Sequence, residues 1–350
     1  MSGFLKKLLI TIAFFALTGG SFGIGILVAQ LKLNAQKNAQ GVPVLSQKEK
    51  TAKEIEAIPE NVVIPQEEVT VDPPKEIVTE PEKKEEIKFS FAVIGDTQND
   101  PNNSSGNLAQ ASRSLAKQDV KFILATGDIV SSCDGGSKCD GKLAKWKSFF
   151  KQKTYPVQGN HDRVGEEKAD KAWQNFFDLP RNGPAGFSEL VYSFDYANSH
   201  FVALASDNPK ENLINSTQRK WLESDLARNK QKNIFVFFHE PAYPTNSKIG
   251  ESLDENPSER NALWVILKKY KVTAVFSGHE HIQSRRKVDG VYQFGFGNTD
   301  AFNHLAPKPG TTEYSFVGSG YGLVSVVDAQ VTVKTLSVNG ALLNSFVIPR

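Results

Sequence analysis

The sequence predicts a layered α/β fold in which two mixed β-sheets pack against each other. Short apolar runs that end abruptly in polar residues are typical of strands buried on both faces. Amphipathic segments at helical spacing lie between these runs, and alternating strands and helices indicate an α/β architecture. A further set of short strands, separated by turn residues, suggests a second sheet packed on the first.

Each expected element follows from its local pattern. Apolar runs predict strands at residues 89–94, 122–125, 155–157, 234–238 and 273–276. Apolar residues at helical spacing predict helices at residues 107–117, 142–151, 168–177, 217–228 and 257–270. The strands of the second set are expected at residues 191–196, 200–205 and 292–296 and within 314–348.

Residues 1–31 are predicted to hold a single membrane-spanning helix. Residues 8–29 contain 22 positions without a charge, and at about 1.5 Å each they reach about 33 Å, enough to cross a hydrocarbon core of about 30 Å. The alternative is a cleaved signal peptide with Lys6 and Lys7 ahead of its apolar part, but no clear small-residue cleavage site follows. Lysines on both sides of the segment prevent charge counting from fixing its orientation.

Residues 32–87 are predicted to form a disordered linker, because they are rich in Pro, Glu and Lys and show no helical or strand periodicity. Residues 88–350 then form the folded domain. We expect a single-pass protein of the cell membrane with this domain extracytoplasmic, or a secreted protein if the first segment is cleaved. The short tail before the apolar segment and two cysteines close enough to pair favour the extracytoplasmic side.

The composition excludes several classes of protein. A formal net charge of +2 provides no global positive field to hold a polyanion, so no nucleic-acid binding is expected. Two cysteines cannot build a disulfide-dense scaffold or a four-cysteine zinc site. A hydrophobic content of 39% is sufficient for a large core, which excludes wholesale disorder.

Five successive strands end in residue types that bind metals. They are followed by Asp96-Thr97-Gln98, Gly127-Asp128, Gly159-Asn160-His161-Asp162, His239-Glu240 and Gly278-His279-Glu280-His281. The carboxyl ends of strands in an open α/β sheet meet in one crevice, so these side chains are expected to converge. Glycine before four of the five groups is expected to allow a sharp backbone turn. Four of the six histidines lie here, which a purely structural role does not explain.

The order of these motifs resembles the calcineurin-like metallophosphoesterase superfamily, in particular its purple-acid-phosphatase-like branch. The resemblance covers residues 89 to about 300, and residues 159–162 and 278–281 carry it most specifically. It implies a four-layer α-β-β-α sandwich at residues 88–350 and a binuclear metallophosphoesterase, which is a phosphoric ester hydrolase. The implied cofactors are two divalent or trivalent metal ions, and the implied substrate is a phosphate ester.

The resemblance also implies how the ligands are divided. The first metal would be held by Asp96 and His281, both metals by a bridging Asp128, and the second by Asn160, His239 and His279. A bridging carboxylate can neutralise two nearby cations at once. Nitrogen and oxygen ligands without a thiolate select Mn, Fe or Zn over Cu(I) and argue against an oxygen-only calcium site.

The implied chemistry is attack on phosphorus by a hydroxide that bridges the two metals. His161, beside the ligand Asn160, would stabilise or protonate the leaving oxygen, and Asp162 would orient its imidazole. Tyr243, four residues after His239, is a candidate substrate contact at the rim. His200, at the start of a strand, is expected to be structural.

Two positions depart from the family pattern. Many members carry Asp-x-His where this chain has Gln98, which could supply an amide oxygen to the first metal or leave the place to water. The purple enzymes place a tyrosinate three residues after the bridging Asp, where this chain has Ser131. We therefore expect weaker binding of the first metal and no purple charge-transfer band in the iron-loaded protein.

Cys133 and Cys139 follow the bridging Asp128. If they are oxidised, their disulfide closes a loop at the rim of the site and contributes about 2 kcal/mol by loop entropy. The alternative is a pair of free thiols in a reducing compartment.

The leading functional hypothesis is a membrane-tethered, extracytoplasmic, metal-dependent phosphohydrolase. A phosphodiesterase or nucleotide hydrolase with the same metal pair is an alternative, because pocket walls decide between monoesters and diesters. A tethered binding module that lost turnover through Gln98 and Ser131 is the non-enzyme alternative.

Overall fold

The computed structural model describes residues 86–98, 106–301 and 306–349. The expected membrane-spanning segment at residues 8–29 and the expected linker up to residue 85 lie outside these ranges. Within the described ranges, no helix combines the length and the apolar character that crossing a membrane requires. All described residues belong to one compact unit, Glu80–Arg350.

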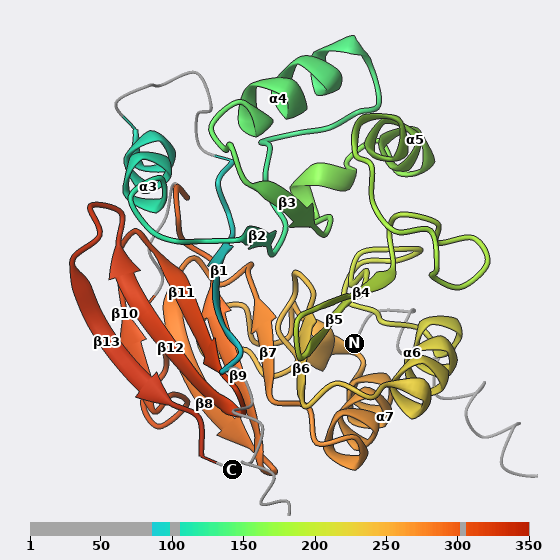
Figure 1. The fold of residues 1–350 in the computed structure, drawn as a ribbon. Helices are drawn as coiled ribbons and strands as arrows, with labels where there is room; N and C mark the ends of the chain where they lie inside the picture. The colour runs from blue at the N-terminus through green and yellow to red at the C-terminus, as the bar shows by residue number, and fades with distance from the viewer. Residues whose placement is uncertain (1–85, 99–105, 302–305, 350) are drawn as a thin grey trace, which may run out of the picture. The chain divides into compact units, whose positions relative to one another are not determined.

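Two mixed sheets form the centre of this unit (Figure 1). The first has the strand order β13-β12-β11-β1-β2-β3. Its strands are β1 (Lys88–Ile94), β2 (Phe122–Ala125), β3 (Lys153–Pro156), β11 (Gly320–Val327), β12 (Gln330–Ser337) and β13 (Leu342–Val347). The second has the order β10-β8-β9-β7-β6-β5-β4. Its strands are β4 (Tyr192–Tyr196), β5 (Ser199–Ala203), β6 (Asn233–Phe237), β7 (Ala274–Ser277), β8 (Gln283–Val288), β9 (Val291–Phe296) and β10 (Tyr314–Phe316).

Each sheet has a parallel centre and antiparallel margins. In the first sheet β1, β2 and β3 run parallel, with Ala92 opposite Ile123. In the second sheet β5, β6, β7 and β9 run parallel, with Phe237 opposite Phe276. The other strand pairs are antiparallel. Continuous apolar sequences suit the parallel strands because both of their faces are covered.

Aromatic side chains join the two sheets face to face. The ring of Phe91 on β1 lies 5.2 Å from both Phe201 on β5 and Phe235 on β6, measured between ring centroids. Phe122 on β2 lies 5.1 Å from Phe201 in an edge-to-face arrangement. Such pairs contribute about 0.5–1.5 kcal/mol beyond the burial of their surface. The prediction of two packed mixed sheets is therefore confirmed.

Helices accompany both sheets. In Figure 1, three of them lie beside β1, β2 and β3, namely α3 (Asn107–Leu115), α4 (Ser137–Lys147) and α5 (Glu167–Phe176). Beside the second sheet lie α6 (Ser216–Arg228) and α7 (Pro257–Lys269). The side chain of Asn215 caps α6 by accepting a hydrogen bond from the Gln218 N–H. Helix α7 begins with a proline, which is favoured at a first helical position.

The expected assignment of strands to sheets was partly wrong. The five apolar runs do not form one sheet, since β1, β2 and β3 lie in the first and β6 and β7 in the second. The late strands β11, β12 and β13 extend the first sheet. Local apolar patterning identifies buried strands, but it does not say which strands pair.

Two elements also differ from expectation. The helix expected at residues 142–151 begins at Ser137 and ends at Lys147. Strand β8 was missed because its sequence QSRRKV is polar. The turn that follows β8, formed by Asp289 and Gly290 with φ values of 50° and 92°, is a strong hairpin signal that could have identified it.

His200 on β5 has the structural role that the sequence suggested, since its Nδ1 lies 2.6 Å from Asp195 and its Nε2 lies 2.8 Å from Asp225. Burial lowers the pKa of His200, but the hydrogen bonds to Asp225 and Asp195 outweigh burial and raise it. A raised pKa in the folded state gives stability that is complete below the unfolded pKa of about 6.5 and is lost as the pH rises through the folded value.

We therefore expect the free energy of unfolding to fall as the pH rises above about 6.5, and the variant His200→Gln to lack this component. At pH 6 the substitution should cost about 1.5–3 kcal/mol, because hydrogen bonds to charged groups are lost. Urea unfolding of both proteins at pH 6 and pH 9 measures the difference. An equal pH dependence in the two proteins would contradict the prediction.

Candidate metal centre

The backbone at the strand ends aims the candidate ligands. Asp96, Asp128, His279 and His281 have φ values of 49°, 51°, 69° and 49°. This left-handed conformation is uncommon for residues other than glycine and costs about 1–3 kcal/mol each. Strained residues of this kind cluster at functional sites. Gly127, with a φ of 90°, makes a sharp turn as the sequence suggested, and elsewhere the ligand residues themselves make the turns that were expected of the preceding glycines.

Two of the neighbouring glycines, Gly159 and Gly278, allow close packing against the ligands. A Cβ atom on Gly159 would overlap Oδ1 of Asp128, and one on Gly278 would overlap Oδ2 of Asp96. The backbone at these two positions therefore packs directly against the carboxylates. A side chain at either position would force a ligand-bearing loop to move.

The first half of the centre contains Asp96, His281 and Gln98. The Nε2 atom of His281 lies 3.3 Å from Oδ1 of Asp96, and the Gln98 amide nitrogen lies 3.4 Å from the same Nε2 atom. The His279 N–H donates to both Asp96 oxygens, at 3.0 and 2.9 Å. Within the described part of the chain, Oε1 of Gln98 and Nδ1 of His281 are buried without a hydrogen-bond partner. Gln98 therefore belongs to the centre spatially.

The second half is arranged around Nε2 of His239. This atom lies 3.2 Å from Oδ1 of Asn160, 3.3 Å from Nδ1 of His279 and 3.4 Å from Oδ2 of Asp128. The side chains of His239 and Asp128 are almost completely buried. One ligand atom each from Asp96, Asp128 and His239 lie within 4.8 Å of one another. The six residues expected to hold metals thus meet at one place.

Backbone carbonyl groups orient the two imidazoles of this half. Nδ1 of His239 donates to the Thr126 carbonyl at 2.8 Å, so its Nε2 atom points inward. Nε2 of His279 donates to the Glu251 carbonyl at 2.9 Å, which leaves Nδ1 pointing inward. Metal-binding histidines are fixed in this way, with the outer nitrogen held by a carbonyl or carboxylate. The donor set therefore fits transition-metal ions.

The pKa values of the candidate ligands are those expected of buried groups that bind a cation. Burial raises the pKa of Asp96, although His281 and His239 act against it. Burial also opposes the charge of Asp128, but His239 outweighs it and lowers that pKa. Burial lowers the pKa of His279 to about 3, with a further contribution from His239, so this imidazole is neutral. Bound metal ions would replace the protons that pair with these carboxylates.

His161 and Asp162 have different surroundings. His161 is half-exposed, its Nδ1 atom donates to the Ser131 carbonyl at 3.3 Å, and its Nε2 atom lies 3.9 Å from Asp128. The expected orienting role of Asp162 was wrong, because the buried Asp162 carboxylate accepts backbone N–H bonds of 3.0–3.2 Å from Ile129, Val130 and Gly159. Asp162 therefore joins the loop that carries Asp128 to the loop that carries Asn160.

The charge state of Asp162 reflects opposing effects. Burial and the nearby Asp128 carboxylate raise the pKa of Asp162 to about 8, while the backbone donors of Gly159, Val130 and Ile129 lower it. Metal ions bound at Asp128 would offset the negative charge of its carboxylate. They would therefore lower the pKa of Asp162 and favour its ionised form, which these backbone donors stabilise.

The structure joins Cys133 and Cys139 in a disulfide, and both residues are buried. The backbone N–H of Cys133 donates to the His161 carbonyl at 3.2 Å, and the Gly165 N–H donates to the Cys133 carbonyl at 2.9 Å. The closed loop therefore supports the segment that carries His161.

Tyr243, the candidate substrate contact, packs between two elements of the fold. Its ring packs edge-on against Trp264, with centroids 4.8 Å apart, and the Arg260 guanidinium lies 4.6 Å from the ring centre. The Arg286 guanidinium lies 5.6 Å from the same ring. These contacts make Tyr243 a packing residue between α7 and β8, and its contact with a substrate stays a prediction.

A cavity of about 270 Å³ opens beside the second half of the centre. Two of its lining residues are the candidate ligands Asn160 and His279. The others are Glu211, Asn212, Glu240, Lys248 and Glu251. Sequence reasoning assigned none of these five a role. The position of Glu240 directly after His239 was the signal that could have identified it.

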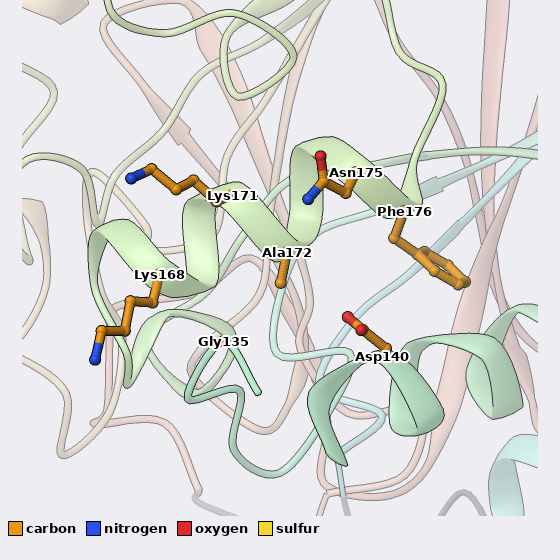
Figure 2. A pocket seen from close by; sticks show the side chains of 7 residues that line it. All are labelled: Gly135, Asp140, Lys168, Lys171, Ala172, Asn175 and Phe176. Carbon is orange, nitrogen blue, oxygen red and sulfur yellow. The ribbon is translucent and has the colours of Figure 1, made fainter. Parts of the chain in front are cut away.

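Another cavity, of about 430 Å³, lies between α4 and α5 and is shown in Figure 2. Lys168 and Lys171 line it, but in Figure 2 their ammonium groups extend away from the Asp140 carboxylate. No candidate metal ligand lines this cavity. Because its polar groups do not converge, we assign the chemistry to the cavity beside His279.

Comparison with known proteins agrees with this geometry. The model of the family described as "Calcineurin-like phosphoesterase" matches residues 89–283. Purple acid phosphatase 21 of Arabidopsis thaliana is 29% identical over 69% of this chain and 57% of its own length. Fe(3+)-Zn(2+) purple acid phosphatase 12 of the same organism is 24% identical over 59% of this chain and 45% of its own. The chain spans about half the length of the curated plant relatives that it matches.

The fold has a counterpart among solved structures. A purple acid phosphatase from yellow lupin (Lupinus luteus) superposes with a TM-score of 0.62 at 18% identity, over 75% of this chain and 54% of the lupin chain. This likeness concerns the fold, whereas the family match includes the segments that carry the candidate ligands up to His281. The chain belongs to the calcineurin-like phosphoesterase family, in the branch that resembles the purple acid phosphatases.

Proposed function

We propose that this protein is a phosphohydrolase that cleaves phosphate esters with the help of two metal ions. The observation that carries the proposal is the convergence of Asp96, Asp128 and His239 within 4.8 Å, with the inward-facing nitrogen of His239 fixed by the Thr126 carbonyl. Asp96 and His281, with Gln98, would hold one ion. The other would be held by Asn160, His239 and His279, with Asp128 shared between the two.

Metal ions at such a site supply Lewis-acid charge to phosphoryl oxygens and lower the pKa of water. Nitrogen and oxygen donors without sulfur suit Mn, Fe or Zn. The name of one Arabidopsis relative includes Fe(3+) and Zn(2+), which supports the choice of iron or zinc.

The chain's own residues contribute positioning and proton transfer. His161 is 44% exposed and lies at the edge of the centre, so its Nε2 atom can reach a bound ester. Its Nδ1 proton is held by the Ser131 carbonyl, and the ring can therefore donate a second proton from Nε2 to the leaving oxygen. The Asp162 carboxylate holds the loop of Asp128 and the loop of Asn160 together by hydrogen bonds.

The experiment is hydrolysis of p-nitrophenyl phosphate and bis-p-nitrophenyl phosphate by metal-stripped protein before and after addition of Mn, Fe or Zn. We expect activity only after addition, and the ratio of the two rates separates a monoesterase from the alternative phosphodiesterase. Iron-loaded protein should lack a visible charge-transfer band, since Ser131 cannot act as a tyrosinate. No hydrolysis of either ester with any of the metals would reject the proposal.

We further propose that residues 8–29 anchor the protein in the cell membrane with the domain extracytoplasmic. Two observations support this placement, namely the 22 residues without a charge and the Cys133–Cys139 disulfide, because disulfides persist in oxidising compartments. Alkaline carbonate extraction of membranes, followed by protease treatment of intact cells, tests it. Recovery in the soluble fraction at full length would reject the anchor, and recovery without the first segment would support secretion.

A further inference from the structure

Glu280 lies between the candidate ligands His279 and His281 and is only 1% exposed. Both neighbours have left-handed backbone conformations, with φ values of 69° and 49°. Residues other than glycine keep such a strained conformation only where the surrounding structure holds it. The contacts of Glu280 should therefore include those that hold the two ligands in place.

Four hydrogen bonds join Glu280 to the loop of residues 245–252. The Oε1 atom of Glu280 accepts from the backbone N–H of Thr245, from the Thr245 hydroxyl at 2.9 Å and from the Asn246 N–H at 3.0 Å. The Asn246 side-chain amide donates to the Glu280 carbonyl at 2.7 Å. Thr245 and Asn246 are completely buried. These bonds fix the turn between the two ligands and the start of the loop together, and their energy offsets the strain of the turn.

The same loop supplies the carbonyl group that orients His279. Nε2 of His279 donates to the Glu251 carbonyl at 2.9 Å. Two bonds within the loop connect this carbonyl to the residues that Glu280 holds. The Lys248 N–H donates to Oδ1 of Asn246 at 3.0 Å, and the Glu251 N–H donates to the Lys248 carbonyl at 3.0 Å. The position of the Glu251 carbonyl therefore depends on the contacts of Glu280.

We propose that Glu280 is a positioning residue of the metal centre, which keeps the Nδ1 atom of His279 directed at the second metal. It acts through the loop of residues 245–252, to which its Oε1 atom is bonded. The proposal rests on the proposed phosphohydrolase function and adds a supporting residue to the same centre. Removing the groups that hold the outer nitrogen of a ligand histidine typically lowers metal affinity about 10–100-fold.

The tautomer of His279 in the metal-free, full-length protein gives the first measurement. Nitrogen NMR shifts of the imidazole distinguish a proton on Nε2 from one on Nδ1. We expect the Nε2–H form alone in the unmodified protein, because the Glu251 carbonyl accepts that proton. Glu280→Ala should give a mixture of both forms. Glu280→Gln keeps an acceptor oxygen for Thr245 and Asn246, so it should restore the Nε2–H form.

The affinity for Zn²⁺ gives the second measurement. Titration against a chelator should show that Glu280→Ala raises the Kd of one of the two ions about 10–100-fold, with Glu280→Gln close to the unmodified protein. The control is Asn233→Ala. Asn233 is also buried and donates to the Asp328 carbonyl at 3.1 Å, but it begins β6, whereas His239 follows the other end of that strand. This variant should lower the free energy of unfolding and leave both the Kd and the tautomer unchanged.

Asn246→Ala provides the same test if Glu280→Ala does not fold. It removes the amide group that joins the Glu280 carbonyl to the Lys248 N–H. We expect the same mixture of His279 tautomers and a Kd that is raised in the same direction.

The outcomes separate the two proposals. Absence of p-nitrophenyl phosphate hydrolysis by the unmodified, metal-loaded protein rejects the phosphohydrolase function, while the tautomer measurement still tests Glu280. An unchanged tautomer and Kd in the alanine variants overturns the positioning role alone. Equal changes in Asn233→Ala also overturn it, since lost stability would then account for them. A Glu280→Gln protein that behaves like Glu280→Ala overturns it as well.

Discussion

The variant Asp128→Asn should lose phosphoesterase activity by about 10³-fold or more, because the charge that two metals share is worth several kcal/mol and each 1.36 kcal/mol is tenfold in rate. The amide keeps the shape of the side chain, and its oxygen can still accept the 2.9 Å bond from the His161 N–H. The loss should therefore reflect the missing negative charge facing His239. Metal analysis should show fewer than two ions bound per chain.

Asp119→Asn is the matched control. Asp119 precedes β2 as Asp128 follows it, but its side chain is 85% exposed and pairs only with Lys121 among the described residues. This variant should keep its metal content and activity, since exposed ion pairs contribute little. If Asp128→Asn also kept both, Asp128 would not be a shared ligand and the assignment of the centre would fail.

Much of the centre could be predicted from the sequence because its signal is local. Asp96, Asp128 and Asn160 each follow a short apolar run, and the carboxyl ends of parallel strands meet at one edge. That reasoning holds for the strands of the first sheet. His239 and His279 follow strands of the second sheet, and they join the same site because the two sheets pack through rings such as Phe91 and Phe235. The sequence suggested convergence without showing that two sheets produce it.

The remaining features depend on contacts between distant residues. Tyr243 lies four positions from His239, but its environment is set by Trp264 and by cations from two other elements. Glu280, between two candidate ligands, accepts a hydrogen bond from the Thr245 hydroxyl at 2.9 Å. No local pattern encodes such a pairing across 35 positions. The direction of a side chain at a turn depends on its tertiary contacts, and local sequence patterns do not show these contacts.

The role of Asp162 is where the expectation from the sequence and the structure differ most clearly. If Asp162 oriented His161, then Asp162→Ala and His161→Ala would both lose activity and keep their stability. The structure predicts a different result, because Asp162→Ala leaves the buried N–H groups of Ile129, Val130 and Gly159 without an acceptor. Each orphaned group costs about 1–3 kcal/mol, so the loss of the acceptor for all three should lower the free energy of unfolding by about 3 kcal/mol or more.

The two variants should therefore separate on measurements other than rate. His161→Ala is expected to reduce kcat by about 10²–10⁴-fold, the usual contribution of a general acid, with metal content unchanged. Asp162→Ala should unfold at lower urea concentration and lose metal as well as rate, because the loops of Asp128 and Asn160 lose their common anchor. Asp162→Asn, which retains one acceptor oxygen, should lie between Asp162→Ala and the unmodified protein. If Asp162→Ala matched His161→Ala in stability and metal content, the carboxylate would act on the imidazole, and its role in joining the two loops would be refuted.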